Sequence, residues 1–219
     1  DGEAGKWGAG EFATLLSDGG ASAGDLDAAI AKVRPEDSCL IMYTSGTTGM
    51  PKGVRLSHRN IISQQKALSI IWDVDETDVL QSYLPWHHSF GGIFERFTTL
   101  YMGSELCIDD SRGQDIDRMI ENWRHFQPTI FFSVPRVHDL LMTRCRESSD
   151  AADLVLSGRL RFCFTAGASL PRHVEQAYRE HAIPVLEGWG LTETSPSVTL
   201  TSFDTPWRSG YVGFPIPGV

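Results

Sequence analysis

One stretch of the sequence combines glycine, hydroxyl residues and a lysine in a way that suits phosphate. Residues 43–53 read YTSGTTGMPKG and follow directly on an apolar run at residues 39–43, whose length predicts a buried strand. Glycine lets backbone amides approach a ligand closely, Ser and Thr hydroxyls donate further hydrogen bonds, and lysine supplies a mobile cation. The sequence therefore predicts a polyphosphate-binding loop, whose members are Thr44, Ser45, Gly46, Thr47, Thr48, Gly49 and Lys52.

Two other interpretations of this loop are disfavoured. A Walker-type phosphate loop requires glycine immediately before the lysine, whereas this chain has Pro51 there. A simple surface turn also uses Gly, Ser and Thr, and any single glycine here would mean little. The whole string favours the phosphate-binding interpretation.

A second block of the sequence carries groups that suit a nucleotide. Residues 164–170 read FTAGASL, and residues 184–196 read PVLEGWGLTETSP. The face of Trp189 can stack on a purine, the Thr192 hydroxyl can donate to phosphate, and Glu193 is a hard oxygen ligand suited to Mg²⁺. Taken alone, Trp189 is as well explained as a core residue, and Glu193 as a solvated charge.

Together, the two blocks resemble the signatures of the adenylate-forming superfamily, which comprises acyl-CoA synthetases, luciferases and the adenylation domains of peptide synthetases. The resemblance covers residues 35–219. It implies that Lys52, Thr192 and Glu193 are catalytic and that Glu193 holds Mg²⁺. It also implies a second set of nucleotide-binding residues, namely Gly167, Ala168, Glu187, Gly188, Trp189, Gly190, Leu191 and Thr192.

This chain departs from the family pattern at three positions. Trp189 stands where tyrosine is usual, Ala166 where glycine is frequent and Ser169 where proline is frequent. We expect these differences to alter affinity without changing the class of chemistry.

The segment LPWHHSFGG, at residues 84–92, resembles the part of the family sequence that borders the acyl pocket. The resemblance places His88 and Gly190 at the acid substrate. A metal site at His87 and His88 is disfavoured because adjacent side chains point differently. A buried imidazole bonded to backbone is the structural alternative for His88.

The acid itself is indicated only by class. The segment has no aspartate that could pair with an α-amino group, which peptide-synthetase adenylation domains have, so the favoured substrate is a carboxylic acid without one. The stretch PTIFFSVPRVHDLL resembles fatty-acyl-CoA synthetases most closely. ATP, Mg²⁺ and CoA are the cofactors and cosubstrates that the resemblance implies.

The elements that must position these residues alternate between strand and helix. Short apolar runs predict strands at 39–43, 54–56, 79–84, 105–108, 129–134, 160–164 and 184–186, and apolar periodicity predicts helices at 25–32, 58–72, 94–101, 115–126, 135–146 and 172–181. Ser57 is predicted to cap the helix that follows it, and Pro171 to lie in the first turn of another. The alternation favours a layered α-β-α sandwich.

Composition limits the alternatives. The 219 residues carry a formal net charge of −9, which provides no positive field for nucleic acid. The four cysteines are widely spaced, which favours free thiols in a cytoplasmic protein, and no apolar run is long enough to span a membrane. The resemblance leaves peripheral membrane association and oligomeric state open.

The resemblance also predicts the extent of the chain. Residues 1–34 are expected to be a flexible lead-in with short helices, including a turn at 11–16, and 35–219 to be the core of the AMP-binding domain, without the hinge and the C-terminal domain. We therefore expect the isolated chain to show little turnover and weak ATP binding. Loading of a carrier protein, luciferase-like oxidation and a non-catalytic nucleotide-binding scaffold are the alternatives.

Overall fold

The computed structural model describes residues 23–45, 50–206, 208 and 210–219, and these divide into two compact units, residues 1–37 and 38–219. In the first unit the described residues form helix α2 (Ala23–Ile30), close to the predicted helix at 25–32. The predicted helical turn at 11–16 lies outside the described residues.

The second unit is built on a seven-stranded sheet with the strand order β4-β3-β5-β6-β7-β8-β9. The first five of these strands pair in parallel, and the last two pair antiparallel. The strands are β3 (Val79–Ser82), β4 (Glu105–Ile108), β5 (Ile130–Ser133), β6 (Phe162–Ala166), β7 (Val185–Gly190), β8 (Ser197–Leu200) and β9 (Phe214–Pro215).

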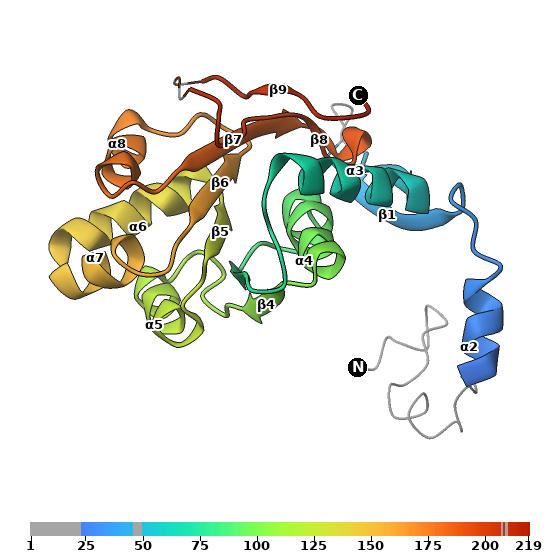
Figure 1. Ribbon diagram of the computed structural model, residues 1–219, viewed down its shortest axis with the longest axis horizontal. Helices are drawn as coiled ribbons and strands as arrows, with labels where there is room; N and C mark the ends of the chain where they lie inside the picture. The colour runs from blue at the N-terminus through green and yellow to red at the C-terminus, as the bar shows by residue number, and fades with distance from the viewer. Residues whose placement is uncertain (1–22, 46–49, 207, 209) are drawn as a thin grey trace. The chain divides into compact units, whose positions relative to one another are not determined.

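Helices cover both faces of this sheet, as Figure 1 shows. One layer contains α5 (Ile116–Phe126), α6 (Pro135–Glu147), α7 (Ser149–Leu156) and α8 (Arg172–Glu180). The other contains α3 (His58–Ile71), the π-helix η2 (Phe90–Glu95) and α4 (Arg96–Met102). The predicted three-layer α/β architecture is confirmed.

Alternation along the central strands explains why both faces need cover. On β5, Phe131 packs with the core of α5 to α8, whereas its neighbours Ile130 and Phe132 pack with the core of α3 and η2. Cys163 on β6 likewise faces the first core, while Phe162 and Phe164 face the second. Successive side chains of a strand point to opposite faces, so continuous apolar runs place a core on each side.

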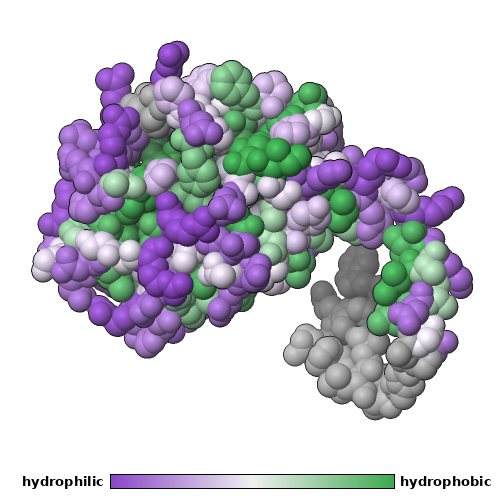
Figure 2. Space-filling model, viewed as in Figure 1, coloured by the Kyte–Doolittle hydropathy of each residue, from purple (hydrophilic) through white to green (hydrophobic). Residues whose placement is uncertain are grey.

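The outer surface of the α5 to α8 layer is polar. Figure 2 shows hydrophilic side chains gathered over these helices, and ion pairs cross between them, including Arg144 with Asp117 at 2.6 Å. Arg118 pairs with Asp110 at 2.9 Å on the same layer. These pairs are solvent-exposed and add little stability, but they keep this face soluble.

The apolar run at residues 39–43 forms a strand, as predicted, but most of this strand is not buried. It belongs to β1 (Ser38–Thr44), which pairs antiparallel with β2 (Lys52–Ser57) in a separate two-stranded sheet. Met42 is buried, but Ile41 and Tyr43 are exposed by 57% and 72%. The prediction of a buried strand was wrong, because within the described residues only one face of this ribbon packs, against Ile61 and Ile93.

Three smaller differences separate the structure from the sequence prediction. Pro171 is the N-cap of α8 and not a residue of its first turn. The strand predicted at 184–186 continues to Gly190, so Trp189 lies on a strand. Helix α7 and strands β8 and β9 were not predicted.

Candidate functional site

A cavity of about 730 Å³ opens at the carboxyl ends of β5, β6 and β7. In open α/β sheets this edge is where ligands bind, because the loops that follow the strands can diverge there. Its lining includes many of the residues predicted from the sequence, namely His88, Gly167, Ala168, Glu187, Gly188, Trp189, Gly190 and Leu191.

Two segments that are distant in sequence meet beside this cavity. Thr192, on the one-turn helix η3 (Thr192–Thr194), donates from Oγ1 to Ser89 Oγ at 3.3 Å. The backbone amide of Ser197 donates to Gln64 Oε1 on α3 at 2.7 Å. This hydrogen bond ties the chain just after η3 to the helix layer that contains α3, η2 and α4. The GWGLTE and LPWHHSFGG segments are therefore held against each other.

The predicted phosphate-binding loop is flanked by β1 and β2. Thr44 and Lys52 are partners in the β1–β2 ladder and mark the two ends of the loop. Strand β2 contacts η3, so the strand that begins at Lys52 lies beside the helix that carries Glu193. Gly46, Thr47, Thr48 and Gly49 lie outside the described residues; Thr44, Ser45, Lys52, Thr192 and Glu193 are described but do not line the cavity.

On strand β7, Gly188 and Gly190 lie unusually close to neighbouring atoms of the chain. A Cβ on Gly190 would lie 1.8 Å from the Pro196 carbonyl oxygen, and a Cβ on Gly188 would lie 2.4 Å from Leu200 Cδ2. Only glycine fits at position 190, where the obstacle is backbone, whereas at position 188 the Leu200 and Phe164 side chains would have to move. Trp189, between them, is half-exposed at the cavity, and Glu187 is buried in its wall.

The turn after β6 leaves room for a ligand beside its backbone. Gly167 has φ of +91°, and a Cβ added there would meet nothing within 4 Å. Gly167, Ala168 and Ser169 are all exposed and line the cavity. The requirement for glycine here is conformational and leaves open space for a ligand beside the backbone.

Glu193 meets the basic requirement for a magnesium ligand. It is exposed on η3, and Mg²⁺ is usually held by one or two carboxylates together with substrate phosphates. Among the residues that the structure describes, no group of three His, Cys, Asp or Glu side chains could hold a metal by itself. A single exposed carboxylate of this kind fits an ion that is held mainly by its nucleotide.

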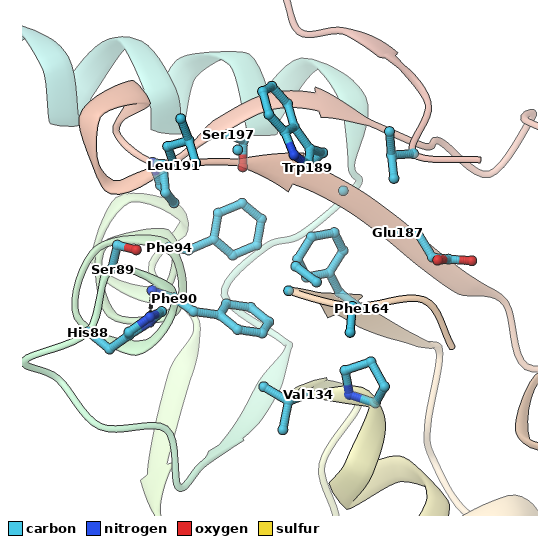
Figure 3. A pocket seen from close by; sticks show the side chains of 18 of the residues that line it. His88, Ser89, Phe90, Phe94, Val134, Phe164, Glu187, Trp189, Leu191 and Ser197 are labelled. Atoms are coloured by element: carbon cyan, nitrogen blue, oxygen red, sulfur yellow. Dashed lines mark hydrogen bonds between the residues drawn. The ribbon is translucent and has the colours of Figure 1, made fainter. Parts of the chain in front are cut away.

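His88 stands at the rim of the cavity, where Figure 3 shows it beside Ser89 and Phe90. The backbone amide of Phe90 donates to His88 Nδ1 at 3.2 Å, so the neutral ring carries its hydrogen on Nε2. The ring is exposed, which excludes the alternative of a buried histidine.

Packing of η2 explains the two glycines of LPWHHSFGG. A Cβ on Gly91 would lie 2.8 Å from the Leu84 carbonyl oxygen, and one on Gly92 would lie 1.9 Å from the Trp86 carbonyl oxygen. The π-helix therefore lies directly against the backbone of residues 84–86. This contact sets the position of Ser89 and Phe90 at the cavity.

Residues that sequence reasoning did not assign to the site form its floor and its support. Phe90, Phe94 and Phe164 line the cavity, and Ser89 holds Thr192. Glu95 is fully buried beneath them on η2, and its burial raises the pKa of its carboxyl to about 8 although Ser82 Oγ donates to it at 2.5 Å. The motifs in or beside which these residues lie can be recognised in the sequence, but the burial and contacts of the residues depend on the tertiary fold.

Comparison with protein families gives a match over nearly the whole chain. The model of the family described as AMP-binding enzyme matches residues 6–219. Long-chain-fatty-acid–CoA ligase 2 of Schizosaccharomyces pombe is 32% identical over 230 residues, covering 85% of this chain and 33% of that protein. Anthranilate–CoA ligase of Pseudomonas aeruginosa is 30% identical over 196 residues, covering 89% and 36%.

Solved structures share the fold. ATP-bound MatB from Rhodopseudomonas palustris superposes with a TM-score of 0.70 at 27% identity, over 89% of this chain and 39% of that one. The anthranilate CoA ligase AuaEII in complex with anthranoyl-AMP gives a TM-score of 0.73 at 24% identity, over 84% and 35%. The chain thus spans about a third of the length of the curated relatives it matches.

Proposed function

This chain belongs to the AMP-binding enzyme family, and from that premise we propose that it forms the nucleotide-binding part of an acid:CoA ligase. In the proposed reaction an oxygen of the substrate carboxylate attacks the α-phosphorus of ATP. The bond from that phosphorus to the bridging oxygen breaks, which gives an acyl-adenylate and pyrophosphate. The thiol of CoA then attacks the acyl carbonyl, loses its proton, and releases AMP.

The observation that carries this proposal is the convergence of three sequence blocks at one edge of the sheet. The Ser89–Thr192 hydrogen bond joins the LPWHHSFGG and GWGLTE segments, and β2, the strand that begins at Lys52, contacts η3. A surface turn or a chance motif would not require these distant segments to meet beside a single large cavity. The arrangement supports adenylation chemistry, for which position and charge matter more than a side-chain nucleophile.

The proposed roles follow from the chemistry of each group. Lys52 and the hydroxyls of Ser45, Thr47 and Thr48 bind the leaving phosphates, and Thr192 donates to the α-phosphate. Glu193 holds Mg²⁺, which when bound neutralises phosphate charge. The adenine lies along Gly167 and Ala168 beside Trp189, and the acid lies between His88 and Gly190.

The acid is proposed by class. The names of the relatives differ, since one acts on long-chain fatty acids and another on anthranilate. We propose a fatty or other carboxylic acid without an α-amino group, because LPWHHSFGG offers no carboxylate to an ammonium group.

Location is also a proposal. All four cysteines lie in the described part of the chain and are free thiols, which supports a reducing, cytoplasmic compartment. None of the described helices has the length and apolar character needed to cross a membrane.

Calorimetry with Mg²⁺ and ATP tests the proposal directly. Lys52→Ala and Glu193→Ala should each weaken ATP binding by roughly tenfold, the scale of one charge-assisted contact. Lys66→Ala and Glu76→Ala change the same residue types at exposed positions on α3 and before β3 and should bind as the parent chain does. If the folded chain does not bind ATP, or binds it equally in all five proteins, the chain is a scaffold and the proposed function is wrong.

A second measurement addresses the extent of the chain. Because it spans about a third of its relatives, we propose that ATP binds without measurable formation of acyl-adenylate. Pyrophosphate release from the purified chain, followed with a mixture of acids, should stay at the uncatalysed rate. Turnover comparable with that of an intact ligase would contradict this part of the proposal.

A further inference from the structure

The inner end of the cavity is closed by three phenylalanine rings in mutual contact. Phe94 and Phe164 stack with ring centroids 4.7 Å apart, and Phe90 meets each of them edge-on at 5.9 and 5.7 Å. All three line the cavity and are at most 9% exposed. We refer to Phe90, Phe94 and Phe164 as the aromatic floor. Figure 3 shows their rings gathered below Ser197 and Trp189 and above Val134.

A second layer of aromatic residues supports this floor from behind. Phe132 does not line the cavity, and its ring centroid lies 5.4 Å from that of Phe94 and 5.5 Å from that of Phe164. Trp72 lies 5.5 and 5.0 Å from the same two rings and is fixed by a hydrogen bond from Nε1 to the Thr201 carbonyl at 3.3 Å. Interiors packed in this way do not open easily for a ligand.

The floor is also closed along β7. The space where Gly188 lacks a Cβ is occupied by Phe164, since a Cβ there would lie 2.9 Å from Phe164 Cζ. The Phe164 ring therefore lies close to β7 at Gly188. An alkyl chain that entered from the rim would meet this packed aromatic wall.

Polar groups lie at the rim of the cavity, directly beside the aromatic floor. His88 and Ser89 stand at the rim, where Thr192 Oγ1 donates to Ser89 Oγ. An acid with its carboxylate at this rim would direct its remaining atoms onto the aromatic floor. Aromatic rings favour offset or edge-to-face contact with other rings, which a flat ring can provide and a long flexible chain cannot.

From these observations we infer that the aromatic floor selects a compact acid whose carboxylate is attached to or near a single ring, of benzoate size, and excludes long-chain fatty acids. The inference rests on the proposed function, because it presupposes that the acid occupies this cavity. It narrows the acid class to the compact members. Phe94 and Phe164 are the residues that set the limit.

Stable analogues of the acyl-adenylate test this inference without turnover. We would measure by calorimetry how the chain binds sulfamoyladenosine itself and its benzoyl, hexanoyl and palmitoyl derivatives. The benzoyl compound should bind more tightly than the palmitoyl compound by roughly tenfold or more, the scale on which a shaped apolar pocket discriminates. In Phe94→Leu and Phe94→Ala the preference should fall to within about threefold, since removing ring atoms opens the floor.

The matched control is Phe131→Leu. Phe131 is fully buried on the same sheet, but it packs in the other core and does not line the cavity. Its substitution should cost stability while leaving the acyl preference of the parent chain unchanged. If Phe94→Ala does not fold, Phe94→Leu and the preference of the parent chain still decide the question.

The outcomes separate the two proposals. Equal or tighter binding of the palmitoyl compound would overturn the inference and leave the proposed nucleotide site intact. A preference for the benzoyl compound that survives in both Phe94 variants would also overturn it. If neither sulfamoyladenosine nor any derivative binds to chain that circular dichroism shows to be folded, the proposed function fails, and the inference fails with it.

Discussion

Thr192 Oγ1 donates a hydrogen bond to Ser89 Oγ at 3.3 Å, although the two residues are 103 positions apart in the sequence. Ser89 comes just before the π-helix η2, and Thr192 opens the helix η3 that also carries Glu193. This contact connects the side of the cavity proposed for the acid with the side proposed for phosphate. It gives Thr192 an acceptor that limits its rotamers before a nucleotide arrives.

Loss of this acceptor should weaken nucleotide binding. In Ser89→Ala the Thr192 side chain loses the contact that holds its rotamer, so part of the binding free energy must orient it before its single hydroxyl hydrogen turns to the phosphate. A net hydrogen bond contributes about 0.5–1.5 kcal/mol, which corresponds to a Kd for MgATP raised about two- to tenfold in calorimetry. Ser69→Ala, at an exposed position of α3, is the control, and equal affinities in both variants would show that the contact has no role in binding.

Gly92 should tolerate no side chain. A Cβ there would lie 1.9 Å from the Trp86 carbonyl oxygen and 2.8 Å from Met42 Cε. Gly92→Ala must push η2 away from residues 84–86, and overpacking of this kind costs about 1–3 kcal/mol or more. Urea unfolding would measure the loss. In Gly53→Ala the new methyl meets only side chains, the nearest being Ile41 Cγ2 at 3.3 Å, and a comparable loss there would contradict the explanation.

The sequence predicted those elements whose signals are local. The Ser57 cap and the helix after it are confirmed: α3 begins at His58, Ser57 Oγ accepts from the Asn60 amide at 3.2 Å, and Asn60 Oδ1 accepts from the Ser57 amide at 2.9 Å. Helices α5 and α6 also begin within a residue of the predicted positions. Caps and apolar periodicity act within a few residues, so they can be recognised without a fold.

Elements that depend on tertiary contacts were missed or misjudged. The apolar run of β1 predicted a buried strand, but burial requires partners on both faces, and this ribbon has packing on one. The π-helix η2 arises because Gly91 and Gly92 let it press against the backbone of residues 84–86, which no local pattern specifies. Helix α7, with the sequence SDAADLVL, spans only 8 residues, which is too short for a clear periodicity.

The candidate site divides in the same way. The glycine-rich and GWGLTE motifs could be recognised in the sequence, because their residue types at those spacings are specific. The aromatic floor could not, since Phe164 on β6 is far in sequence from Phe90 and Phe94 on η2, and any one of them resembles an ordinary core residue. The roles proposed for the motif residues remain predictions.

The cap on α3 should have a measurable effect on stability. In Ser57→Ala the Asn60 amide loses its acceptor at the first turn, and removal of such a cap costs about 1 kcal/mol. Ser63→Ala is the matched control: Ser63 Oγ donates to the Asn60 carbonyl within the same helix, and alanine is the better helix former there. Urea unfolding should show a lower midpoint for Ser57→Ala alone. A similar fall in both variants would mean that the cap is not the cause.

Glu95 should make the stability of the chain depend on pH. Burial raises the pKa of its carboxyl from 4.5 to about 8. Ser82 Oγ donates to Oε2, while Oε1 has no hydrogen-bond partner among the residues that the structure describes. Between about pH 4.5 and 8 the folded state therefore keeps a proton on Glu95 that the unfolded state has released. Its contribution to the free energy of unfolding is fully present below about pH 4.5, falls as pH rises from there to about 8, and then levels off.

Glu95→Gln should remove this dependence. An amide has no proton to lose in this range, and its carbonyl can still accept from Ser82 Oγ. Urea unfolding at a series of pH values should therefore show the variant close to the parent chain near pH 5 and more stable than it near pH 9, by a few kcal/mol as an order of magnitude. Glu76→Gln changes an exposed carboxylate and should follow the parent profile. Parallel profiles for the parent chain and Glu95→Gln would mean that Glu95 is ionised in the folded state and reaches water, contrary to its burial.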